Sequence, residues 1–325
     1  MRNFLLLFYF VTSILHAQDQ LKLTLGVNTF TGSHFLEHCA SIACGGDSWE
    51  EGEYVISGGD PTSRLLYDNI ENRSFFVEAS GSFSNVDLRS FYMSGTNDSG
   101  TLRDQDWYNI EGVDSFYEVS DTLSNLKGNS HSAFLITGGY QFQFTNLLIT
   151  PTIGLISYDE RLIARGLIEQ MSDYTAAFDI PLGPIDGIGE NEIVIKNHAE
   201  WSGNLIGIRG TINASPEFMI GAFYGLANTK VENMDSHVLR DDLGAAPNIK
   251  SYGNGQAKIL HIDASYSINN QLSLNLGYRY WGFLDSEGIT KFGPSFSHSY
   301  PEEIETKLGG LYVGMSYLFD INNVE

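Results

Sequence analysis

The chain has 325 residues and carries 40 Asp and Glu against 18 Lys and Arg, which gives a formal net charge of −22 at pH 7. This acidic balance argues against a nucleic-acid partner, because phosphate groups are bound by clustered Lys and Arg. It favours cationic partners such as basic peptides, although acidic loops can also simply keep an exposed surface soluble. The length allows one large domain or two of ordinary size.

The N-terminal residues have the order typical of a secretory signal peptide. Arg2 supplies the positive start, an apolar stretch runs from Phe4 to Leu15, and Ala17 is a small residue at a plausible cleavage site. The apolar stretch is too short for a membrane anchor. We therefore expect residues 1–17 to be a signal peptide and residues 18–325 to form one exported domain.

Two cysteines, Cys39 and Cys44, lie close together in the sequence. They either close a small disulfide loop or remain free thiols, and the oxidising compartment of an exported protein favours the disulfide. The chain has 8 His but no His/Cys cluster with zinc-ligand spacing. The sequence therefore predicts no metal site.

Apolar residues alternate with polar residues and glycines in several segments. The alternation is clearest in residues 134–144, 260–268, 272–280 and 311–319. No segment after the signal peptide has the roughly 20 consecutive apolar residues of a transmembrane helix, so a membrane would have to be crossed by strands. An apolar face opposite a polar, glycine-rich face is what a lipid-facing barrel strand requires. A soluble β-sandwich would show the same alternation, but the signal peptide and the flanking aromatic residues favour a membrane barrel.

Short and long connections alternate along the chain. Short turns are expected at residues 68–73, 145–146, 213–216 and 269–270. Long polar loops are expected at about residues 38–60, 98–130, 166–192, 233–254 and 287–304. This rhythm predicts an all-β fold, a ten-stranded antiparallel transmembrane β-barrel with long extracellular loops in the outer membrane of a Gram-negative bacterium. Both chain ends would lie in the periplasm.

Two acidic motifs lie at the outer ends of the expected strands. Asp104 and Asp106 fall in the second long loop, and Asp235 and His237 fall where the seventh strand enters the fourth loop. A spacing of two places each pair on one face of an extended segment. Counting the alternation from Phe218 predicts that Asp235 and His237 face the lumen at the outer rim.

These residues could activate water. An Asp beside a His fixes the imidazole tautomer and stabilises its protonated form, so the neutral ring can take a proton from water. Two carboxylates across the groove could hold that water and bind a tetrahedral intermediate through shared protons. The alternative is that both motifs are simply solvated side chains in acidic loops.

The chain resembles the omptins, outer-membrane aspartyl-type endopeptidases of Gram-negative bacteria, over nearly all of its exported length. The strongest matches are Asp104-Gln105-Asp106-Trp107 and Asp235-x-His237. Weaker matches are Leu25-Gly26, Thr31-Gly32, Ser63-Arg64-Leu65, Ala164-Arg165-Gly166 and Tyr317-Leu318-Phe319. The resemblance implies that His237 with Asp235 activates water, while Asp104 and Asp106 position it at a groove open to the exterior.

The resemblance also implies two substrate-binding carboxylates that favour basic substrates. One of these positions is Asn233 here, and the other falls at Leu36 or Glu37, depending on a one-residue gap. The cleavage preference therefore stays open, and Glu37 and Asn233 are the expected substrate-binding residues.

The omptin resemblance further implies lipopolysaccharide as a partner needed for activity, held by basic residues on the barrel wall. Arg161 lies two residues from one such position and Glu200 near the other. No other cofactor is expected. Two other functions remain open on the same scaffold: a porin or other structural barrel, and an adhesin that binds host proteins through its acidic loops.

Overall fold

The computed structural model describes residues 20–51, 54–97, 99–111, 116–171, 183–184, 187–240, 243–293 and 298–320. The expected signal peptide, residues 1–17, lies outside these described residues. No helix within the described ranges is long and apolar enough to cross a membrane.

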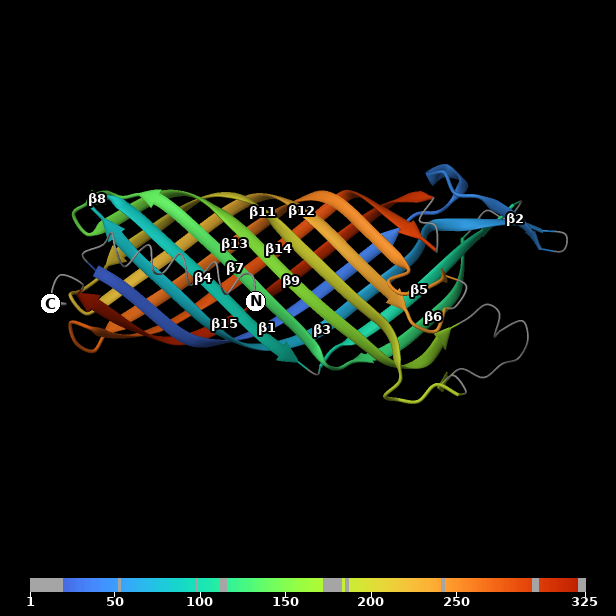
Figure 1. Cartoon of the computed structure of the whole chain (residues 1–325), viewed down its shortest axis with the longest axis horizontal. Helices are drawn as coiled ribbons and strands as arrows, with labels where there is room; N and C mark the ends of the chain where they lie inside the picture. Colours follow the sequence, from blue (N-terminus) through green and yellow to red (C-terminus); the bar gives the residue numbers. More distant parts are fainter. Residues whose placement is uncertain are drawn as a thin grey trace.

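Almost all of the regular structure is β-strand (Figure 1). The first half of the chain contains β1 (Gln20–His38), the 3₁₀ helix η1 (Ile42–Cys44), β2 (Ser48–Glu51), β3 (Tyr54–Phe83), β4 (Val86–Asn97), β5 (Thr101–Ile110), β6 (Phe116–Leu126), β7 (Asn129–Tyr140) and β8 (Phe142–Phe144). The second half contains β9 (Leu147–Met171), β10 (Gly183–Pro184), β11 (Ile193–Asn213), β12 (Phe218–His237), β13 (Ile249–Ser267), β14 (Leu272–Phe292) and β15 (Ser299–Asp320).

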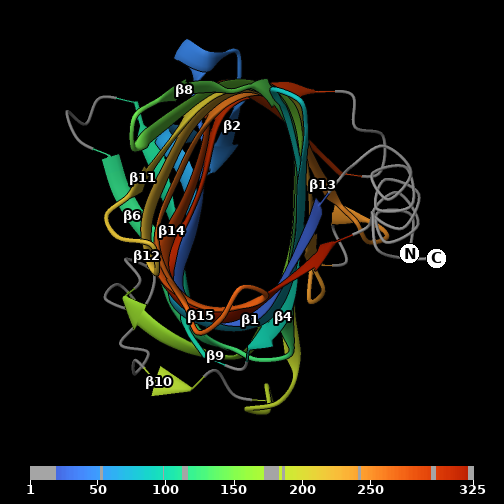
Figure 2. The same ribbon diagram turned by 90° about the vertical axis from the view of Figure 1, so that its left-hand side faces the viewer.

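The strands form one closed antiparallel ring. β4 pairs with the C-terminal part of β3, and β5 pairs with the N-terminal part of β3. β4 and β5 therefore occupy one position in the ring. β6 and β7 share the next position in the same way, each paired with β9. β1 pairs with both β3 and β15, which closes the sheet. The result is the expected ten-strand barrel, and the end-on view shows its closed, oval ring (Figure 2).

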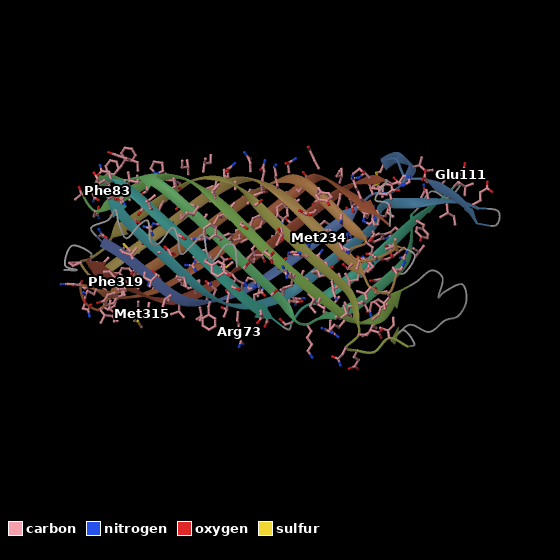
Figure 3. All side chains as sticks on the ribbon, in the orientation of Figure 1. Arg73, Phe83, Glu111, Met234, Met315 and Phe319 are labelled. Carbon is pink, nitrogen blue, oxygen red and sulfur yellow. A yellow bond between two sulfur atoms is a disulfide. The ribbon has the colours of Figure 1, made fainter. Side chains whose placement is uncertain are left out.

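The outer face of the barrel carries a band of exposed apolar side chains. Ile153 is 71% exposed on β9, Ile206 is 66% exposed on β11, and Leu311 is 60% exposed on β15. Phe83, Met315 and Phe319 lie at the end of the barrel opposite Glu111 (Figure 3). This band is the surface that a lipid-facing barrel must present, because strands in lipid alternate apolar side chains outward with polar ones inward.

The lumen is filled by large side chains. Trp201 and Trp281 are both fully buried, and Phe283 packs against both of these rings. A second layer is built around Arg279, whose guanidinium carbon lies 4.0 Å from the ring centroids of Phe76 and Tyr312. In a narrow barrel such side chains leave little room for a continuous water column.

The prediction of a short turn at residues 68–73 is wrong. β3 runs through this segment, and the turn between β3 and β4 comes at residues 84–85. Asn69 has a positive φ of 54°, and the pairing of β1 with β3 shifts register between Gly32 and His34. The turn-like composition therefore marks a β-bulge, in which one strand accommodates an extra residue without ending.

The long loops are also much shorter than expected. β5 and β6 occupy most of residues 98–130, β9 continues to Met171, and β12 continues to His237. Beyond the apolar band both faces of a strand can meet polar surroundings, so the alternation that identifies a lipid-facing strand disappears. The polar segments that we expected to be loops therefore form the part of the barrel wall nearest the loop end.

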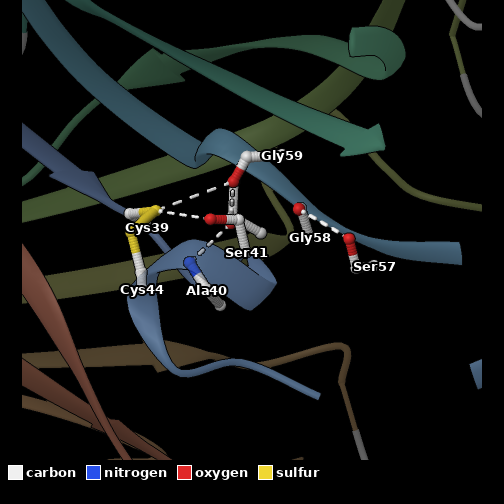
Figure 4. Close-up of a disulfide and its surroundings, with 8 residues drawn as sticks. Cys39, Ala40, Ser41, Cys44, Ser57, Gly58 and Gly59 are labelled. Atoms are coloured by element: carbon white, nitrogen blue, oxygen red, sulfur yellow. Dashed lines mark hydrogen bonds between the residues drawn. A yellow bond between two sulfur atoms is a disulfide. The ribbon is translucent and has the colours of Figure 1, made fainter. Parts of the chain in front are cut away.

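Cys39 and Cys44 form a disulfide, as the oxidising compartment favours (Figure 4). The bridge closes the loop around η1. Its neighbour Ala40 donates its N–H to Thr62 Oγ1 at 2.6 Å, and Thr62 Oγ1 donates to the carbonyl of Gly59 at 2.7 Å. These bonds join the first loop to β3 at the loop end of the barrel.

The packed lumen predicts that the folded barrel does not conduct ions. Refolded protein in a planar bilayer should give no stable conductance steps above those of the protein-free bilayer. A heat-unfolded sample serves as the control for detergent leaks. Regular ohmic steps from the folded barrel would contradict this view of the lumen and favour a porin.

Candidate active site

The two acidic motifs meet in one cleft at the loop end of the barrel. Asp104 and Asp106 lie on β5, and Asp235 and His237 are at the end of β12. All four line a single cavity of about 210 Å³. Its other walls are Leu36, His38, Thr62, Ser63, Leu65, Tyr108, Asn233, Arg240, Leu243, Ile249, Phe292 and Glu302. The closed sheet thus brings together residues that are more than a hundred positions apart in sequence.

This cleft lies beyond the apolar band. On β12 the exposed apolar side chains end at Leu226, and Asp235 follows nine positions later. Met234, the neighbour of Asp235, lies toward the loop end of the barrel in the side view (Figure 3). The cleft is therefore outside the hydrocarbon layer, at the rim of the barrel.

His237 and Asp235 form the first half of the site. His237 Nε2 lies 3.7 Å from Asp235 Oδ2, which is an ion-pair distance slightly longer than a direct hydrogen bond. Asp235 is 2% exposed. Burial lowers the pKa of His237, but the carboxylates of Asp235, Asp104 and Asp106 outweigh it and raise this pKa above 6.5. The cleft therefore favours protonated imidazole.

Asn248 holds the backbone of His237 in place. The His237 N–H donates to Asn248 Oδ1 at 3.0 Å, and Asn248 Nδ2 donates to the His237 carbonyl at 3.1 Å. The Asn248 N–H also donates to the carbonyl of Asp235. Sequence reasoning missed Asn248 because it falls in a segment expected to be a loop and belongs to no motif.

Asp104 and Asp106 form the other half of the site. Burial, together with the charge of Asp106, raises the pKa of Asp104 to about 7. Burial also raises the pKa of Asp106, against the opposing effect of a hydrogen bond from Ser63. Two buried carboxylates close together do not both ionise readily, so the pair holds a proton near neutral pH.

Buried acceptors in the cleft lack protein partners. Among the described residues, Asp104 Oδ1 and Asp235 Oδ1 are buried and accept no hydrogen bond from the protein. A buried acceptor without a partner is costly unless water or a ligand satisfies it. Both oxygens are therefore available to a water molecule or to a substrate that enters the cleft.

Glu302, His38 and Arg240 also line the cleft, and sequence reasoning missed all three. Burial raises the pKa of Glu302 to about 8, although a hydrogen bond from Ser251 opposes the shift. Burial and the charge of His237 lower the pKa of His38 to about 3. Arg240 stabilises the charged forms of Asp104 and Asp106. Only position in the closed barrel identifies these residues.

The expected substrate-binding residues have different locations. Asn233 is 1% exposed and lines the cleft, where its Oδ1 accepts a hydrogen bond from Asn197 Nδ2 at 2.8 Å. Glu37 does not line it. Its carboxylate pairs with Arg64 at 2.6 Å, and Leu36, which has the opposite parity on β1, faces the cleft instead.

Comparison with solved structures identifies a protein with a similar fold. The outer membrane protease OmpT from Escherichia coli superposes with a TM-score of 0.69 at 13% sequence identity, covering 93% of this chain and 97% of that one. The toluene transporter TodX of P. putida gives a TM-score of 0.30 at 9% identity, over 95% of this chain and 92% of that one. The β domain of the Bordetella autotransporter BrkA gives 0.27 at 13% identity, over 93% and 99%. The first of these likenesses shows a shared fold, and the other two are too distant to inform this chain.

Comparison of sequences shows the family. No curated protein matches the chain significantly. The family model described as Protochlamydia outer membrane protein matches residues 57–316, which is well over half of the chain. With its closed barrel and its apolar outer band, the chain is an outer membrane protein that belongs to the Pom family.

Proposed function

We propose that this protein is an omptin-type endopeptidase that cleaves peptides or surface proteins at the extracellular rim. The observation that carries the proposal is the convergence of Asp104, Asp106, Asp235 and His237 on one cleft outside the membrane. Buried titratable groups with shifted pKa values in a cleft are frequent at catalytic sites.

Water is the nucleophile in this mechanism. Neutral His237 takes a proton from a water molecule as the water oxygen attacks the peptide carbonyl carbon, and Asp235 stabilises the imidazolium that forms. The proton held by Asp104 and Asp106 donates a hydrogen bond to the developing oxyanion. His237 then returns its proton to the amide nitrogen, the C–N bond breaks, and a carboxylic acid and an amine leave.

The expected partners follow from charge and from the omptin resemblance. The net charge of −22 favours cationic peptide or protein substrates. The carboxyl group of Glu302, the amide of Asn233 and the apolar side chain of Leu36 all line the cleft. The omptin resemblance implies two further partners, outer-membrane lipid and lipopolysaccharide. Activity should therefore be measured with and without lipopolysaccharide.

The alternative is a non-catalytic barrel that acts as a porin, an adhesin or a structural protein. The packed lumen opposes a porin. Binding of host proteins that is unaffected by loss of His237, in a barrel that cleaves no peptide, would favour an adhesin.

Replacing Asp104 or His237 with Ala should abolish peptide cleavage. Removal of a general base or of a group that stabilises the intermediate lowers rates by roughly 10²- to 10⁴-fold. The measurement is cleavage of a mixed peptide library by protein refolded in detergent, with heat-modifiable gel mobility as the check of folding. Glu111→Gln, at an exposed rim residue outside the cleft, is the matched control. Variants that cleave as fast as the parent protein would refute the mechanism.

The pH dependence of cleavage should be bell-shaped. The base must be neutral, and the pKa of His237 is raised, so activity is lost as pH falls through a value above 6.5. The shared acidic proton is lost as pH rises through the pKa of Asp104, which is about 7. In Asp235→Asn the acid limb should move to lower pH, because a group that raises the His237 pKa is removed. A flat kcat/KM between pH 5 and 8 would count against His237 as the base.

Asn248→Ala should lower kcat more than it changes KM. The variant loses two hydrogen bonds that orient the His237 backbone, while the walls that bind substrate remain. Asn254→Ala, at an exposed residue on the outer face of β13, is the matched control. An unchanged kcat in a folded Asn248→Ala barrel would show that this side chain does not position the base.

A further inference from the structure

A second His/carboxylate cluster lies on the outer wall of the barrel, apart from the cleft. It consists of Asp159 on β9 and of His198 and Glu200 on β11. His198 Nε2 lies 2.9 Å from Asp159 Oδ2 and 3.2 Å from Glu200 Oε1. The three donor atoms all lie within 4.8 Å of one another. One imidazole nitrogen is thus shared by two carboxylates.

The register of the sheet places carboxylates side by side on this part of the wall. Glu200 stands directly opposite Asp159 on one side and opposite Glu232 on the other. Like charges at directly opposed positions destabilise a sheet. Arg161 contacts the cluster, with its Nε 3.6 Å from Asp159 Oδ1, the oxygen that does not face His198, and Lys196 and Lys230 lie on the same outer face two positions from His198 and Glu232. A divalent cation bound by both Asp159 and Glu200 would offset the repulsion between these two opposed carboxylates.

The donor geometry suits a small transition-metal ion. Zinc binds imidazole nitrogen and carboxylate oxygen at about 2.0–2.2 Å, so the ligand atoms of a tetrahedral site lie about 3.3–3.6 Å apart. The two separations from His198 Nε2 are close to this range. An imidazole ligand favours zinc-like ions over calcium and magnesium, which prefer all-oxygen sites. Arg161 would orient the Asp159 carboxylate from outside the metal shell.

We propose that Asp159, His198 and Glu200 bind a divalent cation of the zinc class on the outer wall, with a remaining coordination position open to water or to an anionic oxygen. The site lies just beyond the apolar band, because Leu155 on β9 and Ile206 on β11 are exposed apolar residues a few positions away. The ligands come from two strands, so sequence spacing predicts no metal site here. The proposal does not depend on the proposed protease function.

The test uses refolded full-length barrels that all carry His237→Ala, which removes one of the two cleft imidazoles, His38 and His237, as a competing ligand. Zn²⁺ binding is measured by calorimetry, and Co²⁺ is added as a spectroscopic probe of imidazole coordination. The test variants are His198→Ala and Asp159→Asn. The matched control is His298→Ala, which removes an exposed imidazole 4.0 Å from the carboxylate of Asp47.

The parent barrel and the His298→Ala control should bind one equivalent of Zn²⁺, and Co²⁺ should give visible d–d absorption. His198→Ala should weaken binding by at least about 100-fold, beyond the loss typical of outer-shell changes, and should lose the Co²⁺ spectrum. Asp159→Asn should weaken binding as well. Binding that is equal with and without His198, displacement of Zn²⁺ by equimolar Ca²⁺, or no binding by the folded parent would each overturn the proposal.

Discussion

Closure of the sheet is the constraint on which the rest of this structure depends. In hydrocarbon every backbone N–H and C=O must be paired within the protein, and a barrel achieves this only when its first and last strands join. Here β1 and β15 are paired along almost their whole length, from Gln20 with Asp320 to His38 with Glu302. Once this pairing exists, the alternation of side chains determines which residues face the lipid and which face the lumen. The closed ring also fixes the position of every other strand along the barrel axis.

The same closure carries the barrel beyond the membrane. The wall continues through β5, β6 and the upper part of β12, where apolar residues no longer dominate the outer face. A continuous hydrogen-bonded wall holds side chains more rigidly than loops do. The candidate catalytic residues Asp104 and His237 therefore stand on strands rather than on flexible connections, while the disulfide between Cys39 and Cys44 ties the first loop beside them.

Inside the barrel, the kind of buried side chain changes along the barrel axis, from aromatic rings in the lumen to carboxyl groups at the loop end. Aromatic rings around Trp201, Trp281 and Arg279 fill the middle of the lumen. Above them the walls bring buried carboxyl groups close together, and burial raises the pKa of Asp104 and Glu302 toward neutrality. A fold that is stable in lipid can thus carry acid–base chemistry at its rim.

The sequence by itself determined the barrel class, the outward parity of β12 and the two acidic motifs, because all three depend on a period of two within one strand. Only the tertiary structure decided that Leu36 rather than Glu37 faces the cleft, that residues 68–73 form a bulge, and that Asn248 supports His237. It also decided that His198 and Glu200 meet Asp159. These features depend on register between strands that are distant in sequence, and register is set by closure of the ring, which no local pattern records.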